Sequence, residues 1–383
     1  MTALLPLETA TLPPGVRARF VEGVNGLRMH VLECGERGRP CLLLLHGFPE
    51  LAYSWRKVMP TLAAAGYYVI APDQRGYGRT TGSNDSYDTD LTQYGPFNLV
   101  RDVVGLVYAL GIREVAAIIG HDFGATVAAF GALLRPDLFR SVVLMSAPFS
   151  GPPAIPVGSA DNPDAKATRE SAIHKALAAL DRPRKHYHAY YWTREANANM
   201  HGAKQGVQAF LRAYFHHKSA DWKANKPFRL EGWTASELAK IPTYYIMDLA
   251  DGMAETVAKE APSAAEIAAN QWMPESEMRV FGEEYARTSF QGGLNWYRAR
   301  VEPRVVAELE LLSGRTIDIP SCFIAGRSDW GIYQVPGAIE RMQKEACTRM
   351  SAVHLIEGAG HWVQQERPAE TAQHLLAFLR EQR

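Results

Sequence analysis

The feature that most constrains the fold is a series of short, continuously apolar segments, each followed by a loop that contains glycine and polar residues. A run of about four to eight apolar residues is typical of a strand buried on both faces of a sheet. Stretches with helical periodicity lie between them, at 52–65, 97–110 and 125–134. Strands that alternate with helices predict a mostly parallel, helix-covered sheet and thus an α/β fold. The expected buried strands are 41–45, 67–71, 115–119, 141–145, 321–325 and 353–356.

The segment before the first buried strand has a different character. Residues 17–24 and 27–34 alternate between apolar and polar side chains, and the Asn25-Gly26 pair between them predicts a hairpin turn. The preceding residues, 1–14, include three prolines, which lack the backbone donor that helices and sheets use. We expect them to form an extended arm.

The strand pattern is interrupted once. Residues 151–165 are rich in proline, glycine and aspartate and predict a linker. The following segment has helical periodicity and many aromatic residues, with only 243–247 resembling a buried strand, before the strand pattern returns and ends in a helix at 368–380. One sheet domain with a helical insertion explains this order. The expected parts are an arm (1–14), a core domain (15–150 and 314–383) and a helical cap (151–313).

Composition excludes several classes of protein. Lysine and arginine total 41 in 383 residues, and aspartate and glutamate also total 41, so the net charge favours neither nucleic acid nor an anionic membrane. The longest plain apolar run, 41–45, is far shorter than the ~20 residues of a membrane span. Residues 1–15 lack the pattern of a secretory signal, and the four cysteines are widely spaced without a C-x-x-C motif. We expect reduced thiols and a cytoplasmic protein.

The sharpest local motif is GHDFG at 120–124, between the strand expected at 115–119 and the helix expected at 125–134. Glycines on both sides of one residue permit a tight strand-to-helix turn, which exposes the central side chain at the edge of the sheet. That side chain is Asp122, whose carboxylate can attack an sp3 carbon to form an ester. The simpler interpretation is an aspartate that caps the helix.

A base and an orienting acid follow later strands. His361 lies in a glycine-rich loop after 353–356, and Asp329 lies in the loop after 321–325. Taken singly, these residues are more often a solvated histidine and a turn-forming aspartate. Together with Asp122 they give nucleophile, acid and base in the chain order of an α/β-hydrolase triad.

Backbone donors for an oxyanion are expected in two places. The N–H groups of Phe48, in the loop after 41–45, and of Phe123 could converge on charge that develops at the nucleophile. His46 is interpreted as a brace for its own loop. Asp73 and Arg75, after the next strand, are likewise interpreted as fixing a loop rather than as catalytic residues.

These motifs resemble those of an epoxide hydrolase of the α/β-hydrolase fold. The resemblance implies conversion of an epoxide to a vicinal diol, in detoxification for example, through an ester on Asp122 that water activated by His361 hydrolyses. It also implies that Tyr297 in the cap hydrogen-bonds the epoxide oxygen. The matching segments are HGFPE (46–50), DQRGYG (73–78), GHDFG (120–124), GRSDW (326–330), GAGHW (358–362) and FQGGLNWYR (290–298).

The family has a second cap tyrosine on an earlier helix. Tyr187 is the nearest match, but Trp192 stands where the family has glutamine, so Tyr191, one helical turn on, remains an alternative. Phe123 also stands where the family commonly has tryptophan. The resemblance implies a hydrophobic epoxide and water as the partners. The expected substrate-binding residues are Phe48, Phe123, Tyr191, Trp330 and Trp362.

Two other functions stay open. A haloalkane or haloacid dehalogenase shares the aspartate nucleophile but needs N–H donors for the halide, which phenylalanine at 48 and 123 does not provide. A non-catalytic binding protein of the same fold has no need of the complete set of acid, base and nucleophile. A serine esterase is disfavoured because no serine stands at 122. A homodimer is the candidate assembly.

Cofactors are not expected. The pairs at 186/188 and 216/217 are the candidate metal-binding histidines, but neither has a carboxylate or cysteine at a familiar spacing. The sequence contains no dinucleotide-binding or phosphate-binding glycine motif.

Overall fold

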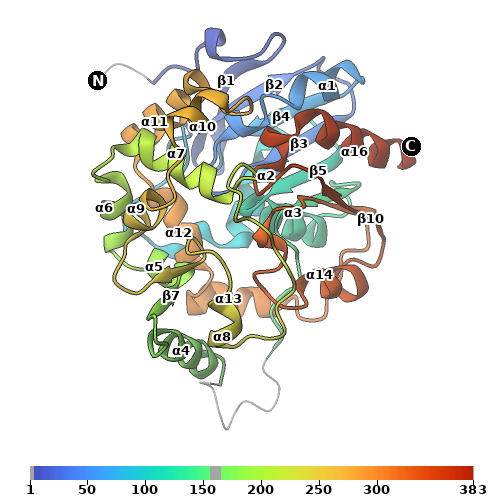
Figure 1. The fold of residues 1–383 in the computed structure, drawn as a ribbon. Helices are drawn as coiled ribbons and strands as arrows, with labels where there is room; N and C mark the ends of the chain where they lie inside the picture. Colours follow the sequence, from blue (N-terminus) through green and yellow to red (C-terminus); the bar gives the residue numbers. More distant parts are fainter. Residues whose placement is uncertain (1–3, 156–164, 383) are drawn as a thin grey trace.

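The structure is a computed structural model that describes residues 4–155 and 165–382. Its centre is one sheet built from segments at both ends of the chain (Figure 1). The strands are β1 (Arg17–Val24), β2 (Leu27–Cys34), β3 (Cys41–Leu45), β4 (Tyr68–Pro72), β5 (Val115–His121), β6 (Val142–Met145), β9 (Ser321–Gly326) and β10 (Met350–Ile356). They lie in the order β1-β2-β4-β3-β5-β6-β9-β10. Strand β2 is antiparallel to its two neighbours, and the other pairs are parallel.

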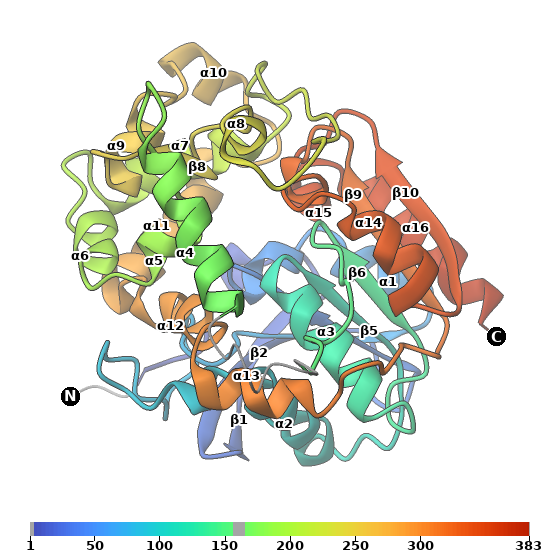
Figure 2. The ribbon, with the colours of Figure 1, turned by 90° about the horizontal axis from the view of Figure 1, so that it is seen from below.

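Helices cover both sides of this sheet (Figure 2). The helices of this part are α1 (Met59–Ala64), α2 (Pro96–Ala109), α3 (Phe123–Leu134), α14 (Ala338–Arg341), α15 (Val363–Glu366) and α16 (Pro368–Glu381), with short helical turns at η2 (Ala52–Trp55), η3 (Leu91–Tyr94), η5 (Trp330–Ile332) and η6 (Met342–Ala346). Helix α1 packs against α16, and α2 packs against α3. Strands β3, β4, β6 and β9 are buried throughout, as their continuous apolar sequences predict. Strand β10 is mostly half-buried, contrary to its prediction as a buried strand, because it lies at the edge of the sheet.

The chain between β6 and β9 forms a group of helices beside the sheet (Figures 1 and 2). This helical cap contains α4 (Ala165–Ala178), α5 (Tyr187–Tyr191), α6 (Glu195–His201), α7 (Val207–Lys218), α8 (Ala235–Leu238), α9 (Met253–Ala258), α10 (Ala264–Ala269), α11 (Glu275–Thr288), α12 (Gln291–Ala299) and α13 (Pro303–Glu310). A two-stranded antiparallel sheet, β7 (Arg184–His186) with β8 (Ile246–Asp248), lies among these helices.

Most strand predictions are confirmed. Strands β1, β2 and β3 have the predicted bounds, and the other strands of the large sheet begin and end within three residues of the prediction. The prediction of a single helix at 52–65 is wrong, because this segment forms two separate elements, η2 and α1. Proline at the first turn of α1 explains the division, because its missing N–H and its ring prevent a helix from continuing through it.

Smaller differences concern short elements. In place of the strand predicted at 243–247, the structure has the shorter strand β8. Its partner β7 was not predicted, because a strand of three residues is too short to show a periodic pattern. The arm contains a helical turn at η1 (Thr9–Thr11). Most of the linker predicted at 151–165 lies outside the described residues, which exclude 156–164.

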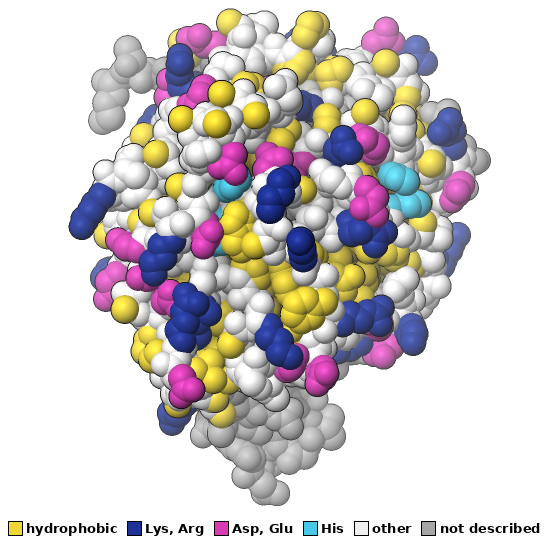
Figure 3. Space-filling view, viewed as in Figure 1, with side chains coloured by type: hydrophobic (Ala, Val, Ile, Leu, Met, Phe, Trp, Pro, Cys, Tyr) yellow, Lys and Arg dark blue, Asp and Glu magenta, His cyan; other side chains and the backbone are white. Residues whose placement is uncertain are grey.

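The surface agrees with the balanced composition. On the face shown in Figure 3, basic and acidic side chains are interspersed around hydrophobic side chains gathered near the centre. All four cysteines are free and buried. Within the described ranges, no helix is long and apolar enough to cross a membrane.

Candidate active site

Asp122 occupies the turn between β5 and α3, in a backbone conformation that few residues other than glycine adopt (φ 53°, ψ −120°). The two glycines of the motif make this turn possible. A Cβ atom at Gly120 would lie 2.0 Å from the Gly124 carbonyl oxygen, and one at Gly124 would lie 2.2 Å from the Leu45 carbonyl oxygen. The turn leaves the Asp122 side chain 15% exposed. Asp122 is thus held in a strained conformation of the kind that concentrates at active sites.

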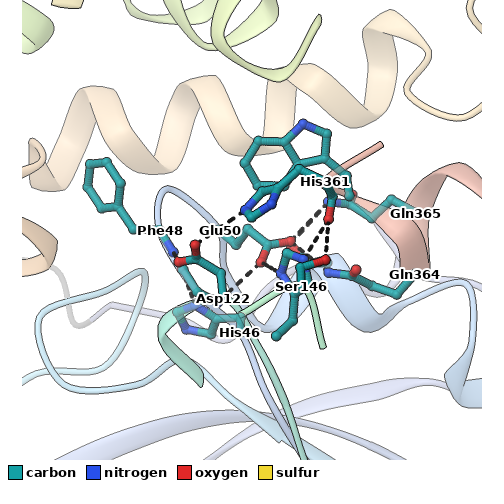
Figure 4. Close-up of polar contacts among 12 residues, drawn as sticks. His46, Phe48, Glu50, Asp122, Ser146, His361, Gln364 and Gln365 are labelled. Atoms are coloured by element: carbon teal, nitrogen blue, oxygen red, sulfur yellow. Dashed lines mark hydrogen bonds and ion pairs between the residues drawn. The ribbon is translucent and has the colours of Figure 1, made fainter. Parts of the chain in front are cut away.

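The three residues predicted as a triad lie together, and Figure 4 shows Asp122 and His361 facing each other. His361 Nε2 is 3.3 Å from Asp122 Oδ2, and Nδ1 of the same ring is 3.1 Å from Asp329 Oδ1. The Asp329 carboxylate is fixed in turn by the backbone N–H of Gly331, at 2.7 Å. The side chains of His361 and Asp329 are each only 1% exposed. The Nε2 atom of the imidazole can therefore accept a proton, while the carboxylate beside Nδ1 stabilises the imidazolium that results.

Electrostatic interactions keep the carboxyl groups of Asp122 and Asp329 ionised. Burial alone would raise the pKa of Asp122, but the hydrogen bond and charge of His361, with the charge of Lys218, lower that pKa well below its ordinary value. Burial also opposes ionisation of Asp329, and His361 again lowers its pKa. A carboxylate at 122 is the form that can act as a nucleophile.

A second buried ion pair lies beneath this group, and the sequence analysis did not predict it. His121 Nδ1 is 2.5 Å from Glu50 Oε2, and His121 Nε2 is 2.7 Å from the His361 carbonyl oxygen. Since both ring nitrogens face acceptors, both must carry protons, which makes this ring an imidazolium. Burial lowers the pKa of His121, but the charge of Glu50 raises it above its ordinary value. The only sequence signal for this pair is that Glu50 lies in the HGFPE segment and His121 in the GHDFG segment.

The loop that carries His361 is held by the cap as well as by the core. Glu366 accepts hydrogen bonds from the backbone N–H groups of Gly360 (2.9 Å), Trp362 (3.0 Å) and Ala220 (2.8 Å). The His361 N–H donates to the Lys218 carbonyl oxygen at 2.9 Å. The last residue of α7 and the residues just after it therefore help to position the histidine.

One predicted oxyanion donor lies at the nucleophile. The Phe48 N–H donates a hydrogen bond of 3.0 Å to Asp122 Oδ1 (Figure 4). Phe123 is the next residue after Asp122. His46 braces this loop, as expected, because its Nε2 accepts from the Gln74 N–H (3.1 Å).

Asp73 and Arg75 also fix loops. Asp73 accepts hydrogen bonds from the N–H groups of Ala52 (2.8 Å) and Arg79 (3.0 Å). Arg75 forms a two-point ion pair with Asp102 (2.8 and 2.7 Å).

Aromatic rings of the cap meet aromatic rings of the core above Asp122. The Tyr297 ring centroid is 4.5 Å from that of Phe123 and 5.4 Å from that of Phe48. Tyr191 and Tyr187 complete the group, at 4.9 and 5.9 Å from Tyr297. The cluster creates an apolar surrounding for the carboxylate.

Glycines in the segment around Tyr297 let α12 approach the core closely. A Cβ atom at Gly292 would lie 2.0 Å from the Gly76 carbonyl oxygen. Beside Tyr297, the Trp296 indole donates to the Arg75 carbonyl oxygen at 2.9 Å. These contacts anchor the end of the cap to the core loop that follows β4 and thereby hold the Tyr297 ring over Phe123.

The two candidate tyrosines on α5 differ in what their hydroxyl groups contact. The Tyr191 hydroxyl lies 3.2 Å from the Tyr214 hydroxyl and donates to it. The Tyr187 ring lies 5.9 Å from that of Tyr297, and the charge of Asp122 adds to the effect of burial in raising the pKa of the Tyr187 hydroxyl.

The two tryptophans predicted to bind substrate lie farther from this cluster. Trp362 is fully buried behind His361, with ring centroids 4.7 Å apart, and its indole donates to the Phe215 carbonyl oxygen (2.8 Å). The Trp330 ring lies 5.0 Å from that of Phe228.

The histidine pairs considered for metal binding have other surroundings. His186 Nδ1 accepts the His188 N–H at the start of α5 (3.2 Å). His217 packs between the rings of Trp222 (4.4 Å) and Tyr244 (4.7 Å). Over the described ranges, no group of three or more histidine, cysteine, aspartate or glutamate side chains is arranged to hold a metal ion.

Comparison with solved structures gives the same fold. An epoxide hydrolase from an endophytic Streptomyces is 29% identical, with a TM-score of 0.76, and the match covers 96% of each chain. Epoxide hydrolase I of potato (Solanum tuberosum) is 30% identical, with a TM-score of 0.73, over 96% of this chain and 99% of the other.

Sequence comparison identifies the family. The family model described as the alpha/beta hydrolase fold matches residues 40–368. Epoxide hydrolase A of Mycobacterium tuberculosis is 35% identical over 358 residues, which are 93% of this chain and 95% of that protein. An epoxide hydrolase of Caballeronia sordidicola is 32% identical over 373 residues, or 97% and 96%. Because such similarity extends over nearly the whole of each protein, the chain belongs to the epoxide hydrolases of the α/β-hydrolase fold superfamily.

Proposed function

We propose that this protein hydrolyses epoxides to vicinal diols in two steps, through an ester on Asp122. The observation that carries the proposal is the position of the ionised Asp122 between a histidine–aspartate pair on one side and the tyrosine cluster on the other. Alkylation of Asp122 needs an acid for the epoxide oxygen, and hydrolysis of the resulting ester needs a base for water. The tyrosines and the histidine–aspartate pair that supply them border the same carboxylate.

In the first step, Asp122 attacks a ring carbon, the carbon–oxygen bond of the epoxide breaks, and the released oxygen takes a proton from a tyrosine. Tyr187 and Tyr297 are the proposed donors. Burial raises the pKa of each hydroxyl well above its ordinary value, so both remain protonated at neutral pH. Positioned acids of this kind typically contribute about 10²- to 10⁴-fold.

In the second step, His361 takes a proton from water, and the resulting hydroxide attacks the carboxyl carbon of the Asp122 ester. The Phe48 and Phe123 N–H groups stabilise the oxyanion that forms, since the first already donates to this carboxylate. Asp329 stabilises the imidazolium. When the tetrahedral intermediate collapses, the bond between the carboxyl carbon and the substrate oxygen breaks, this oxygen takes the proton of the newly formed carboxylic acid, and the diol leaves Asp122 as a carboxylate. The proton held by His361 returns to the ionised tyrosine.

The surroundings of the carboxylate favour hydrophobic epoxides. Phe48 and Phe123 from the core, with Tyr191 from the cap, provide the apolar contacts we propose for the substrate. We place Trp362 behind the histidine, where it packs rather than binds. Residues 151–313 are the proposed extent of the cap domain.

The dehalogenase alternative lacks support from the indole groups that border His361 and Tyr297. A departing halide needs N–H donors, yet the indoles of Trp192, Trp296 and Trp362 donate to backbone carbonyl groups. A side-by-side assay of diol formation, halide release and ester hydrolysis tests the proposal. With styrene oxide and an aliphatic epoxide we expect diol as the main product. Halide release without diol formation would replace this proposal with dehalogenation.

Removing one tyrosine hydroxyl should leave partial activity. We expect Tyr297→Phe and Tyr187→Phe each to slow alkylation about 10- to 100-fold, and the double variant about 10³-fold or more, because an epoxide oxygen can take its proton from either donor. Stopped-flow measurement of alkylation would check this. Tyr191→Phe is the matched variant, with a smaller expected loss because its hydroxyl already donates to Tyr214. A larger loss for Tyr191→Phe than for Tyr187→Phe would exchange their roles.

A further inference from the structure

A buried lysine that the proposed mechanism does not use lies beside the catalytic histidine. Lys218 is the last residue of α7 and is only 3% exposed. Its carbonyl oxygen accepts the His361 N–H at 2.9 Å. In the part of the chain that the structure describes, its ammonium group forms neither a hydrogen bond nor an ion pair. The end of a helix favours a positive charge, but that preference is equally satisfied at the surface and does not account for burial.

The ammonium nitrogen of Lys218 lies within 5.9 Å of the centroids of four aromatic rings, those of Tyr214, Tyr244, Tyr245 and Trp362. It lies 5.3 Å from the centroid of Trp362, whose ring is 4.7 Å from His361. It also lies 5.0 Å from the centroid of Tyr245, whose ring is 5.1 Å from that of Tyr187. Lys218 therefore contacts one ring that neighbours the proposed base and another that neighbours a proposed proton donor.

A second donor beside the lysine lacks an acceptor. The Tyr245 side chain is 1% exposed, and its hydroxyl has no hydrogen-bond partner within the described residues. Buried hydroxyl groups nearly always have a hydrogen-bond partner. In the described part of the chain, the Tyr245 hydroxyl and the Lys218 ammonium both lack an acceptor, which suggests that a bound molecule supplies one. Asp122 and Asp329 act on both groups by charge, which is consistent with their lying at the same site.

The carboxylates of Asp122, Asp329 and Glu50 give the site an excess of negative charge. His121, which is paired with Glu50, is one counter-charge, and Lys218 is a second that reduces the excess. A substrate that carries its own carboxylate would be strongly repelled without Lys218.

We propose that Lys218 and Tyr245 form a subsite for an anionic oxygen group of the substrate, so that the enzyme favours epoxides with a carboxylate on or next to the epoxide ring. The Lys218 ammonium and the Tyr245 hydroxyl both donate to that carboxylate, while Asp122 attacks a ring carbon. This inference rests on the proposed function. It narrows the substrate class from hydrophobic epoxides to those that combine an apolar body with one acidic group.

The test compares two epoxides of nearly equal shape, 3-phenyloxirane-2-carboxylate and its carboxamide. For the unsubstituted protein we expect kcat/KM to favour the carboxylate about tenfold or more, as a hydrogen bond to a charged partner would give. Lys218→Met should remove this preference. Because the loss of a nearby charge can slow both substrates, the measured quantity is the ratio of the two kcat/KM values.

Lys185→Met is the matched control. Its ammonium also lies close to a tyrosine ring, 4.7 Å from the centroid of Tyr190, but it donates to the Leu249 carbonyl oxygen away from the site. The ratio should be unchanged in this variant. If Lys218→Met lowers both kcat/KM values by the same factor, the subsite is refuted and the lysine is only a counter-charge.

A measurement without substitutions keeps the inference testable if Lys218→Met does not fold. Inhibition of styrene oxide turnover by 3-phenylpropanoate should be about tenfold stronger than inhibition by 3-phenylpropanamide. Equal inhibition would overturn the subsite. Styrene oxide turnover itself tests the proposed function separately, because failure to form diol from this neutral epoxide would not depend on Lys218 recognising an anion.

Discussion

Asp122→Ala is expected to reduce diol formation by about 10⁴-fold or more, the scale of loss typical when a nucleophile is removed. Without the carboxylate no ester can form, and the remaining groups can only assist direct attack by water. Steady-state assays with a reactive epoxide, at enzyme concentrations high enough to detect a slow reaction, would measure the loss.

The fold of this variant should be retained. The bonds that fix the turn are made by the backbone, from the Asp122 N–H to Met145 and from the Ala125 N–H to the Asp122 carbonyl oxygen, each at 3.0 Å. Circular dichroism and the melting temperature should therefore stay close to those of the unsubstituted protein. Asp318→Ala removes a carboxylate that bonds Thr316 and Thr348 instead, and should keep full activity. Diol formation by Asp122→Ala at a tenth of the normal rate would show that water attacks the epoxide directly.

The catalytic positions could be predicted from sequence because of how parallel sheets are built. Asp122, Asp329 and His361 each follow a parallel strand of the sheet, and the carboxyl ends of parallel strands meet at one edge of a sheet. Long apolar runs and glycine-bounded turns mark such strand ends in the sequence. Local pattern was therefore enough to bring together three residues that are far apart in the chain.

Other parts of the site depend on contacts that have no local signal. Lys218 follows two histidines in the last turn of α7, and such a basic helix end suggests a solvated surface. Its burial follows from the packing of α7 against the His361 loop, which involves residues nearly 150 positions apart. The same holds for Glu366, which links that loop to Ala220. The choice between Tyr187 and Tyr191 also needed the position of a third ring, that of Tyr214.

His361→Gln should stop the reaction after its first step. Glutamine cannot take the proton of the hydrolytic water, so we expect kcat to fall about 10²- to 10⁴-fold or more. Alkylation should continue, because Asp122 needs no base. The charges of Lys218 and His121, which also lower the pKa of Asp122, remain in this variant. The protein should then accumulate as the ester.

Mass spectrometry of His361→Gln after incubation with a reactive epoxide would detect this ester as a gain of one substrate mass. Peptide mapping should place the added mass on Asp122, and the double variant Asp122→Ala/His361→Gln should gain none. Because the imidazole also helps to keep Asp122 ionised, alkylation in this variant is expected to be slower than normal, and the incubation should extend to minutes. Label on another carboxylate, such as Glu50 or Asp329, would assign the nucleophile to that residue. A protein that stays unmodified by an epoxide that the unsubstituted enzyme converts would exclude a covalent intermediate, since His361 takes no part in forming the bond between Asp122 and carbon.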